Sequence, residues 1–290
     1  MGIEAHTASR RLRSVEPSRS LPSVAGEVEA IVVTYRAPHA LESCLTSIAG
    51  QVLLPAETLV IDNGSSVDES SLASLANAQL VTMPNNSGPA GGHAEGLRRF
   101  LQTDRQWAWM MDDDCFPHAD VLSLLLEEAR RAKPSLLFPT RRDAVSGRVE
   151  NAPAWCGFLI HRDIVAAVGL PREDFFWWAE DTEYLHWRIP SAGFPVTRVH
   201  EAVVEHRKDR RSEHRPPWKI YYETRNSIHY RLRIQRAMGH RFYRLWRTLS
   251  RTLFSVITVR ENRRQRIAAF AAGLKDGFKG RLGKTFDVGD

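Results

Sequence analysis

The sequence predicts an α/β fold in which helices flank a mostly parallel sheet. Short apolar runs, typical of buried strands, alternate with stretches of helical period along the first half of the chain. Three polar clusters, at residues 34–36, 62–64 and 112–114, each directly follow such a run. Because the carboxyl ends of parallel strands meet at one edge of a sheet, we expect the three clusters to lie together and to bind a ligand.

The elements of the first half follow one another regularly. Strands are predicted at residues 30–33, 58–61, 80–82 and 107–111, because each run is apolar and is bounded by polar or turn residues. A helix is predicted where Leu41, Leu45 and Ile48 share one face before Gly50, and another at residues 90–101 after a glycine-rich turn. Such alternation covers both faces of a parallel sheet.

The second half is less regular. We expect a strand at residues 155–160, a helix at 180–189 and a pair of strands between 195 and 204. Residues 1–27, rich in Ser, Arg and Pro, are predicted to be a flexible N-terminal extension. We expect residues 28–215 to form the α/β domain and residues 216–290 to form a basic, mostly helical C-terminal region.

Composition excludes several classes of protein. The chain has 290 residues, 43% of them hydrophobic and 26% charged, which is typical of a globular protein. Three cysteines are too few for a disulfide framework or a zinc cage. The chain has no apolar run of membrane-spanning length, and its first thirty residues lack the apolar run of a signal peptide. We therefore expect a cytoplasmic protein.

The net charge of +6 is unevenly distributed. Residues 1–205 contain 18 Lys and Arg against 27 Asp and Glu, whereas residues 206–290 contain 22 against 7. Within 242–278, apolar residues recur at spacings of three and four with arginines between them, which predicts amphipathic helices. Such helices either contact the anionic inner face of the cell membrane or pack on the α/β domain with a solvated basic face. No nucleic-acid-binding module is recognisable, so we expect no nucleic acid partner.

Three consecutive carboxylates, Asp112, Asp113 and Asp114, follow the strand at 107–111. They repel one another and destabilise the fold unless a cation neutralises them. Mg²⁺ and Mn²⁺ prefer carboxylate oxygens and keep coordination positions for phosphates. The triplet indicates a metal site for a nucleoside diphosphate, and the alternative is a solvated acidic turn.

Two further motifs carry candidate site residues. The stretch 85–93 is rich in Gly and precedes a helix, where it either approaches a phosphate or serves only the turn. Trp177 and Trp178 precede Glu180 and Asp181; they either exclude water from a general base or belong to the core beside an ordinary helix start. His206 ends an apolar run and could complete a metal site as neutral imidazole.

In this order the motifs resemble family 2 glycosyltransferases, which have the GT-A fold with a Rossmann-like sheet. The resemblance spans about residues 28–235 and includes features shared with bacterial rhamnosyl- and galactofuranosyltransferases, such as the triple Asp and the Gly91-Gly92 loop. The matching segments are Val32-Val33-Thr34-Tyr35-Arg36, Val60-Ile61-Asp62-Asn63-Gly64-Ser65, Asn86-Ser87-Gly88, Met110-Met111-Asp112-Asp113-Asp114, Trp178-Ala179-Glu180-Asp181-Thr182-Glu183-Tyr184, Tyr221-Tyr222 and Arg225-Asn226.

The resemblance implies a role for each matching residue. It implies Asp181 as the catalytic base with Glu180 beside it, and Trp177 and Trp178 as walls of the acceptor site. It implies that Mn²⁺ or Mg²⁺ binds to Asp112, Asp114 and His206. The residues implied to contact the nucleotide-sugar donor are Thr34, Tyr35, Arg36, Asp62, Asn63, Asn86, Gly88, Gly91, Gly92, Asp112 and Asp113.

The implied reaction is metal-dependent, inverting transfer of a hexose from a UDP-galactofuranose-like or dTDP-rhamnose-like donor. The acceptor would be a hydroxyl of a glycan, glycolipid or natural product, which needs a base to take its proton. A single base without a carboxylate nucleophile favours inversion. Two alternatives stay open: a sugar-1-phosphate nucleotidyltransferase, although residues 28–40 lack a basic glycine motif, and a non-catalytic adaptor that binds membrane or nucleic acid through residues 206–290.

Overall fold

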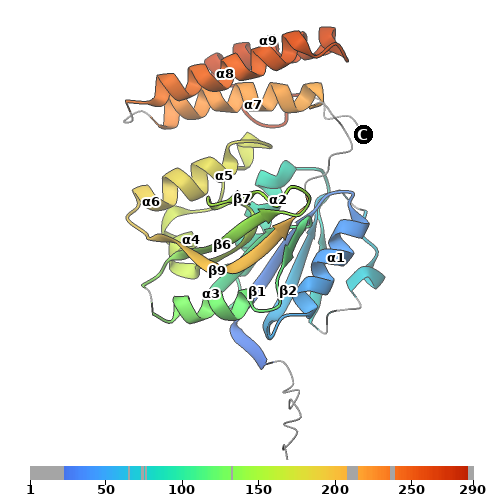
Figure 1. Ribbon diagram of the computed structural model, residues 1–290, viewed down its shortest axis with the longest axis vertical. Coiled ribbons are helices and arrows are strands. Elements are labelled where there is room, and N and C mark those ends of the chain that lie inside the picture. Colours follow the sequence, from blue (N-terminus) through green and yellow to red (C-terminus); the bar gives the residue numbers. More distant parts are fainter. Residues whose placement is uncertain are drawn as a thin grey trace, which may run out of the picture.

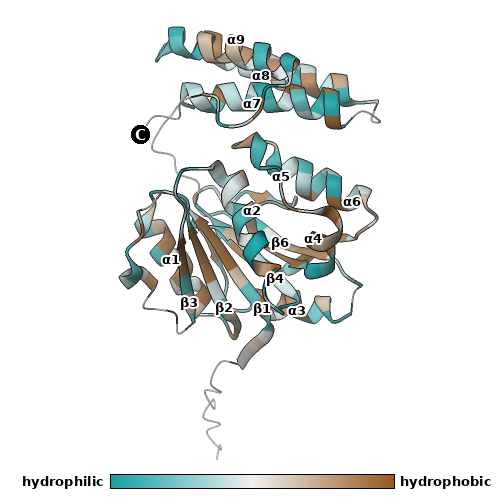
Figure 2. Cartoon of the chain, turned by 180° about the vertical axis from the view of Figure 1, so that it is seen from behind, coloured by the Kyte–Doolittle hydropathy of each residue, from teal (hydrophilic) through white to brown (hydrophobic). Residues whose placement is uncertain are grey.

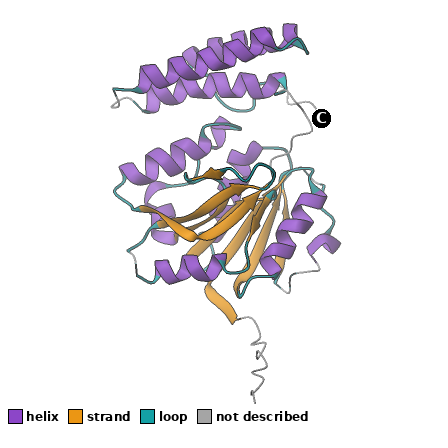
Figure 3. Cartoon of the chain, viewed as in Figure 1, coloured by secondary structure: helices purple, strands orange, loops and turns teal. Residues whose placement is uncertain are grey.

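The computed structural model describes residues 23–64, 66–72, 75, 77–131, 133–207, 215–235 and 239–286. Within these residues nine strands form one sheet, with helices on both faces and a layer of C-terminal helices beyond the carboxyl ends of the first strands (Figures 1 and 3). The strands are β1 (Ser23–Thr34), β2 (Leu53–Asp62), β3 (Ala78–Thr82), β4 (Trp107–Asp112), β5 (Cys115–Pro117), β6 (Leu136–Asp143), β7 (Val149–Glu150), β8 (Cys156–His161) and β9 (Val196–His206).

The sheet has a parallel half and a mixed half. The order is β3-β2-β1-β4-β8-β6-β9-β5, with β7 on β6. Strands β3, β2, β1 and β4 are all parallel, whereas β8 is antiparallel to both of its neighbours and β9 is parallel to β6. The α/β fold and the first four strands are therefore as predicted, and the parallel half brings the three polar clusters to one edge.

Helices cover the sheet on two sides. The helical segments are α1 (Pro38–Ala49), η1 (Glu69–Leu72), α2 (Gly88–Phe100), α3 (Val121–Ala129), α4 (Arg162–Val168), η2 (Glu173–Phe175), α5 (Glu180–Glu183), η3 (Tyr184–Arg188), α6 (Ile189–Ser191), α7 (Pro217–His229), η4 (Tyr230–Ile234), α8 (Arg241–Thr258) and α9 (Arg263–Lys279). Helices α1 and α3 share a core with Val32 and Met111, whereas α2, α4 and η3 share one with Val33 and Met110. Adjacent strand residues thus face opposite cores, and Figure 2 shows these strands as apolar along most of their length.

Two sequence predictions need correction. Residues 195–204 do not form a pair of strands, because β9 is one strand whose polar stretch is absorbed by a bulge: Pro139 pairs with Val199 and Thr140 with Val203. Residues 23–27, predicted to belong to the flexible extension, lie in β1; the rest of that prediction, residues 1–22, lies outside the described residues.

The C-terminal helices pack on the α/β body. This packing is one of the two arrangements expected for the basic amphipathic helices. Phe176 of the body shares a small core with Tyr221 and Tyr222 of α7 and Ala269 of α9. Helices α7 and α9 are joined further by a 2.8 Å hydrogen bond from the Tyr221 hydroxyl to Asp276. Among the described residues, no helix is both long and apolar enough to cross a membrane. The division at residue 215 stays a prediction.

Replacing Glu29 by Gln should stabilise the protein above pH 7. Glu29 is 3% exposed and pairs with Glu57 across β1 and β2. Burial, reinforced by the charge of Glu57, raises the pKa of Glu29 from 4.5 to about 7. The folded state therefore holds this proton more tightly than the unfolded state, and stability falls as pH rises from 4.5 to 7.

We expect Glu29→Gln to raise the free energy of unfolding by about 2 kcal/mol at pH 8 and much less at pH 5, measured by urea denaturation. Glu42→Gln, an exposed change on α1, is the matched control. The same pH response in both variants would show that the Glu29 carboxyl titrates normally.

Candidate functional site

A cleft of about 830 Å³ opens at the carboxyl ends of β1, β2 and β4. It joins the three polar clusters to the glycine-rich loop and to the start of α7, which lies over this edge in Figure 1. Of the predicted site residues, those that line it are Thr34, Tyr35, Arg36, Asn63, Asn86, Gly88, Asp112, Asp113, Asp114 and Trp177. The sheet therefore gathers most of the predicted donor-side residues in one cavity.

Asp62 has a structural position below the cleft. Its side chain is fully buried, and its carboxylate accepts hydrogen bonds from the backbone N–H groups of Gly64, Ser66 and Val67 at 2.7–3.0 Å. These bonds shape the turn after β2 that carries Asn63 into the cleft. The predicted contact between Asp62 and the nucleotide stays a prediction.

The three glycines of the 85–93 stretch lie in different environments. Gly88 lines the cleft with φ +71°, and a Cβ there would lie 2.0 Å from the carbonyl oxygen of Phe176. Gly91 and Gly92 are buried inside α2, and a Cβ on Gly92 would lie 2.5 Å from Val33. Gly92 thus lets α2 approach β1 closely, which holds the loop containing Gly88 against the cleft.

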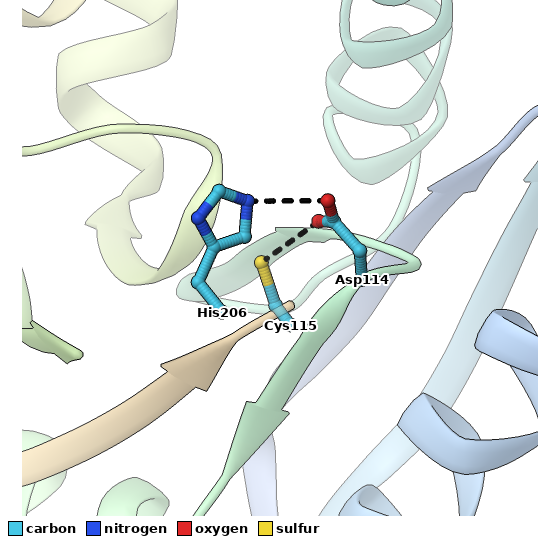
Figure 4. A group of neighbouring side chains, drawn as sticks. All are labelled: Asp114, Cys115 and His206. Atoms are coloured by element: carbon cyan, nitrogen blue, oxygen red, sulfur yellow. Dashed lines mark hydrogen bonds and ion pairs between the residues drawn. The ribbon is translucent and has the colours of Figure 1, made fainter. Parts of the chain in front are cut away.

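Asp114 belongs to a candidate metal centre (Figure 4). Ligand atoms of Asp114, Cys115 and His206 lie within 4.8 Å of one another, and His206 Nε2 is 3.2 Å from Asp114 Oδ2. Pairing of β5 with β9 brings His206 beside Cys115. Burial raises the pKa of the Cys115 thiol well above its usual range, which disfavours the thiolate as a metal ligand, so Asp114 and His206 are the remaining candidate ligands. This oxygen and nitrogen pair suits Mn²⁺ or Mg²⁺ better than a soft metal.

Asp112 has a different histidine partner, His93, which the sequence analysis missed. His93 Nε2 lies 2.9 Å from Asp112 Oδ1, and the imidazole stacks on Trp155 with ring centroids 3.9 Å apart. Burial lowers the pKa of His93 to about 3, so the ring is neutral at pH 7 and donates from Nε2. Burial on the cleft floor and the charge of Asp114 raise the pKa of Asp112 well above its usual range. His93 ends the glycine-rich stretch, but no periodicity marked it as a partner of β4.

Asp113 ties the ends of β1 and β4 together. Its Oδ2 accepts a 2.6 Å hydrogen bond from the Thr34 hydroxyl, and its backbone N–H donates to Val33. Burial raises the pKa of Asp113 to about 7, although the Thr34 hydrogen bond opposes this shift. The three adjacent carboxylates therefore point to three different partners, which limits their mutual repulsion.

A strained loop at residues 175–179 delivers the second acidic pair to the site. Phe176, Trp178 and Ala179 have positive φ of 62°, 74° and 71°, a conformation that costs non-glycine residues about 1–3 kcal/mol each. The fully buried Asn226 of α7 holds the loop in place. Its side-chain amide donates hydrogen bonds of 2.7–2.9 Å to three loop carbonyls, those of Phe175, Trp177 and Trp178.

Glu180 and Asp181 follow this loop and differ in environment. Glu180 is 5% exposed, and burial together with the charge of Asp181 raises its pKa well above the usual range. Asp181 is only partly buried, and its Oδ1 accepts hydrogen bonds from the N–H and the hydroxyl of Thr182. The charge of Asp181 raises the pKa of both Asp112 and His93, although Asp181 is not among the residues that line the cleft.

Aromatic and basic side chains form the far wall of the cleft. Trp177 packs against Trp178 and Trp218 with ring centroids 5.3 and 5.2 Å away. Trp218 and Lys219 of α7 and Arg207 after β9 also line the cleft, and the sequence analysis missed all three. Trp218 and Lys219 lie in the region predicted as a basic C-terminal segment, so their place in the site depends on how α7 folds back over the sheet, whereas the Arg207 backbone N–H is held at Asp114 by a 3.0 Å hydrogen bond.

The chain is similar in sequence to known glycosyltransferases. Residues 29–189, more than half of the chain, match the model of the family Glycosyl transferase family 2. The chain is 29% identical over 212 residues to galactofuranosyltransferase GlfT1 of Mycobacterium tuberculosis strain H37Rv, which covers 62% of this chain and 69% of the relative.

Solved structures of low sequence identity show the same fold. S. aureus TarS in complex with UDP has a TM-score of 0.58 at 15% identity, covering 91% of this chain and 94% of that chain. A mannosyltransferase from Pyrobaculum calidifontis in complex with GDP-Man and Mn²⁺ has a TM-score of 0.54 at 16% identity, covering 89% and 79%. The GT-A fold that the motifs implied is therefore confirmed.

Replacing Asn226 by Ala should release the loop at residues 175–179. The change removes the donors to three loop carbonyls, and an unpaired buried polar group costs about 1–3 kcal/mol. We expect a loss of about 2–4 kcal/mol in the free energy of unfolding and faster amide hydrogen exchange at residues 176–183.

Ser227→Ala, at the neighbouring buried position of α7, is the control. Unchanged exchange at residues 176–183 in Asn226→Ala would show that the loop holds its conformation without α7.

Proposed function

The chain belongs to glycosyltransferase family 2, and from this premise we propose that it transfers a hexose from UDP to an acceptor hydroxyl with inversion. The observation that carries the proposal is the cleft that joins the polar ends of β1, β2 and β4, where the charge of Asp181 also raises the pKa of Asp112. The UDP donor is supported by the similarity to GlfT1 and by TarS, which binds UDP and UDP-GlcNAc. A galactofuranose-like sugar is our first choice, and a dTDP-rhamnose-like donor is the competing one.

The donor would lie along the carboxyl ends of the strands. Thr34, Tyr35, Arg36, Asn63 and Asn86 line this part of the cleft and offer hydrogen-bonding and stacking groups to a base and ribose. The diphosphate would extend toward residues 112–114, where two cationic side chains, Arg207 and Lys219, also line the cavity. Positive side chains attract phosphate oxygens, so the cleft complements both ends of a nucleoside diphosphate.

A divalent cation fits the acidic side of this cleft. We assign Asp114 and His206 as its main protein ligands, with Asp112 turned toward His93 on the other side. The orientation of His206 across β5 supports this, because its Nε2 already faces the Asp114 carboxylate. Bound Mn²⁺ or Mg²⁺ would neutralise charge on the departing nucleoside diphosphate.

Asp181 would act as the general base. Hydrogen bonds from Thr182 orient its carboxylate, whereas the neighbouring Glu180 is buried and its pKa is raised by that burial and by the charge of Asp181. Removing the acceptor proton lets the hydroxyl oxygen attack the anomeric carbon directly, on the face opposite the nucleotide. One base without a carboxylate nucleophile gives inversion.

The acceptor would stack against the tryptophans. Trp177 lines the cleft, and Trp178 is 37% exposed next to it. Flat indole faces suit the apolar faces of sugar rings, which supports a glycan, a glycolipid or a glycosylated natural product as acceptor. Family membership disfavours the nucleotidyltransferase, and the formed cleft disfavours the non-catalytic adaptor.

Variants of Asp181 and Asp114 should separate catalysis from donor binding. We expect Asp181→Asn to lower kcat by about 10²–10⁴-fold while UDP binding with Mn²⁺ stays near wild type, because a base contributes to the chemical step. Asp114→Asn should weaken Mn²⁺-dependent UDP binding about tenfold or more. Calorimetry with UDP and dTDP, each with and without Mn²⁺, and initial rates with UDP-galactofuranose and dTDP-rhamnose measure these effects.

Asp163→Asn, an exposed change on α4, is the control. Wild-type turnover in Asp181→Asn would exclude this residue as the base, and tighter metal-dependent binding of dTDP than of UDP would exclude the UDP donor.

Helix α8 supports contact with a membrane surface. Its residues Leu245, Thr252 and Val256 are buried, yet a second, exposed apolar face also runs along the helix. Arginines lie beside that face at positions 244, 247 and 251. We infer peripheral contact with an anionic membrane, because exposed aromatic residues flanked by arginines match its interface. The exposed face consists of Phe242, Tyr243, Trp246, Leu253, Phe254 and Ile257.

Polar substitution of this face should weaken membrane contact. We expect the double variant Trp246→Ser, Phe254→Ser to bind phosphatidylglycerol vesicles about tenfold more weakly in co-sedimentation, with turnover on a soluble acceptor unchanged. Val145→Ser, which removes an exposed apolar residue far from α8 in sequence, is the control. Equal vesicle binding by both variants would exclude α8 as the contact.

A further inference from the structure

A second cavity, which we call the arginine pocket, lies between the helical segment of residues 182–191 and the C-terminal helices. Its volume is about 480 Å³, within the ~300–1,000 Å³ typical of small-molecule sites. Thr182 and Trp187 line it from the body, Tyr230 and Arg231 from η4, and Arg244 from α8. None of these residues was among the predicted site residues, and the donor cleft does not include them.

The pocket brings two guanidinium groups together without a carboxylate. Arg231 donates a side-chain hydrogen bond to Gln235, and among the described residues neither Arg231 nor Arg244 has a carboxylate within ion-pair distance. Burial lowers the pKa of Arg231, and the charges of Arg244 and Arg247 lower it further. Bringing these cations together costs electrostatic free energy, which a bound anion would offset.

The pocket adjoins the proposed base. Thr182 lines the pocket, and its N–H and hydroxyl both donate to Asp181 Oδ1. Tyr230 also lines the pocket. Burial raises the pKa of Tyr230 to about 12, and the charge of Asp181 contributes a little to this rise. Its phenol is therefore protonated at neutral pH and available as a donor. A ligand held in the pocket would lie next to the carboxylate that receives the acceptor proton.

We propose that the arginine pocket binds a phosphate or diphosphate group carried by the acceptor. Two guanidinium groups offer paired donors that match phosphate oxygens, and Tyr230 adds a neutral donor. The assignment of the ligand as an acceptor rests on the proposed glycosyl transfer, whereas phosphate binding itself does not. The phosphate belongs either to a lipid-linked acceptor or to a soluble phosphorylated glycan. Arg244 lies on α8 between the exposed Phe242 and Trp246, which makes the first source compatible with the membrane face.

The test is calorimetric titration of the full-length protein with inorganic pyrophosphate in metal-free buffer, without donor or acceptor. We expect Arg231→Ala and Arg244→Ala each to weaken pyrophosphate binding about tenfold or more, because each removes charge-assisted hydrogen bonds. Arg264→Ala, which removes one exposed arginine from α9, should bind like wild type. Lys219→Ala tests the other cavity: pyrophosphate held in the arginine pocket binds this variant like wild type, since Lys219 lines the cleft at the strand ends and not the pocket.

Two results would overturn the proposal. One is equal pyrophosphate affinity of wild type, Arg231→Ala and Arg244→Ala, whether or not Lys219→Ala binds pyrophosphate more weakly. The other is an equal loss in Arg264→Ala, which would indicate only the general charge of the region. The two proposals fail separately. Wild-type turnover in Asp181→Asn would contradict only the catalytic proposal, whereas wild-type pyrophosphate binding in Arg231→Ala and Arg244→Ala would contradict only the pocket.

A second arm identifies the source of the phosphate. Vesicles of phosphatidylcholine with and without phosphatidic acid are co-sedimented with wild type and Arg231→Ala. Weaker binding of Arg231→Ala to phosphatidic acid vesicles, together with release of wild type by free pyrophosphate, supports a lipid-borne phosphate. A soluble phosphorylated ligand is supported if neither Arg231→Ala nor free pyrophosphate changes vesicle binding, while Arg231→Ala still loses pyrophosphate binding.

Discussion

The crowding of carboxyl groups at one edge of the sheet is the constraint on which the site depends. Asp112, Asp113 and Asp114 leave the end of β4, and Glu180 and Asp181 approach them from the loop opposite. Like charges this close would separate unless each had its own means of neutralisation. Glu180 is buried and Asp181 is oriented by Thr182, while the partners of the triplet are a neutral imidazole, a hydroxyl and a second imidazole, those of His93, Thr34 and His206.

The C-terminal helices complete this arrangement. Asn226 fixes the strained loop that precedes Glu180, and the neighbouring Arg225 donates to the loop carbonyl of Phe175 and to Gly283 near the end of the chain. The start of α7 supplies Trp218 and Lys219 to the cleft at the strand ends. A region that looks from its composition like a separate basic tail therefore packs on the α/β body, and its charge is divided between the cleft, the arginine pocket and the outer face of α8.

Local sequence patterns predicted the strands that build the parallel half of the sheet. Apolar runs just before Thr34, Asp62 and Asp112 predicted the carboxyl ends of β1, β2 and β4 to within one residue, because burial on both faces requires such runs, whereas β1 and β2 begin five to seven residues earlier than predicted. The pattern failed at β9, where a bulge lets polar residues stay within one strand. A bulge depends on the partner strand, so a single segment carries no signal for it.

The sequence by itself determined the fold class, the family resemblance and the identity of the acidic residues, because strand ends and adjacent carboxylates are local features. Tertiary structure alone decided which histidine meets which carboxylate, since His93 and His206 reach β4 from α2 and β9. It also decided that Lys219 lines the cleft at the strand ends and Arg244 a separate pocket. These contacts join segments far apart in the chain, and the packing that creates them leaves no periodic pattern in either segment.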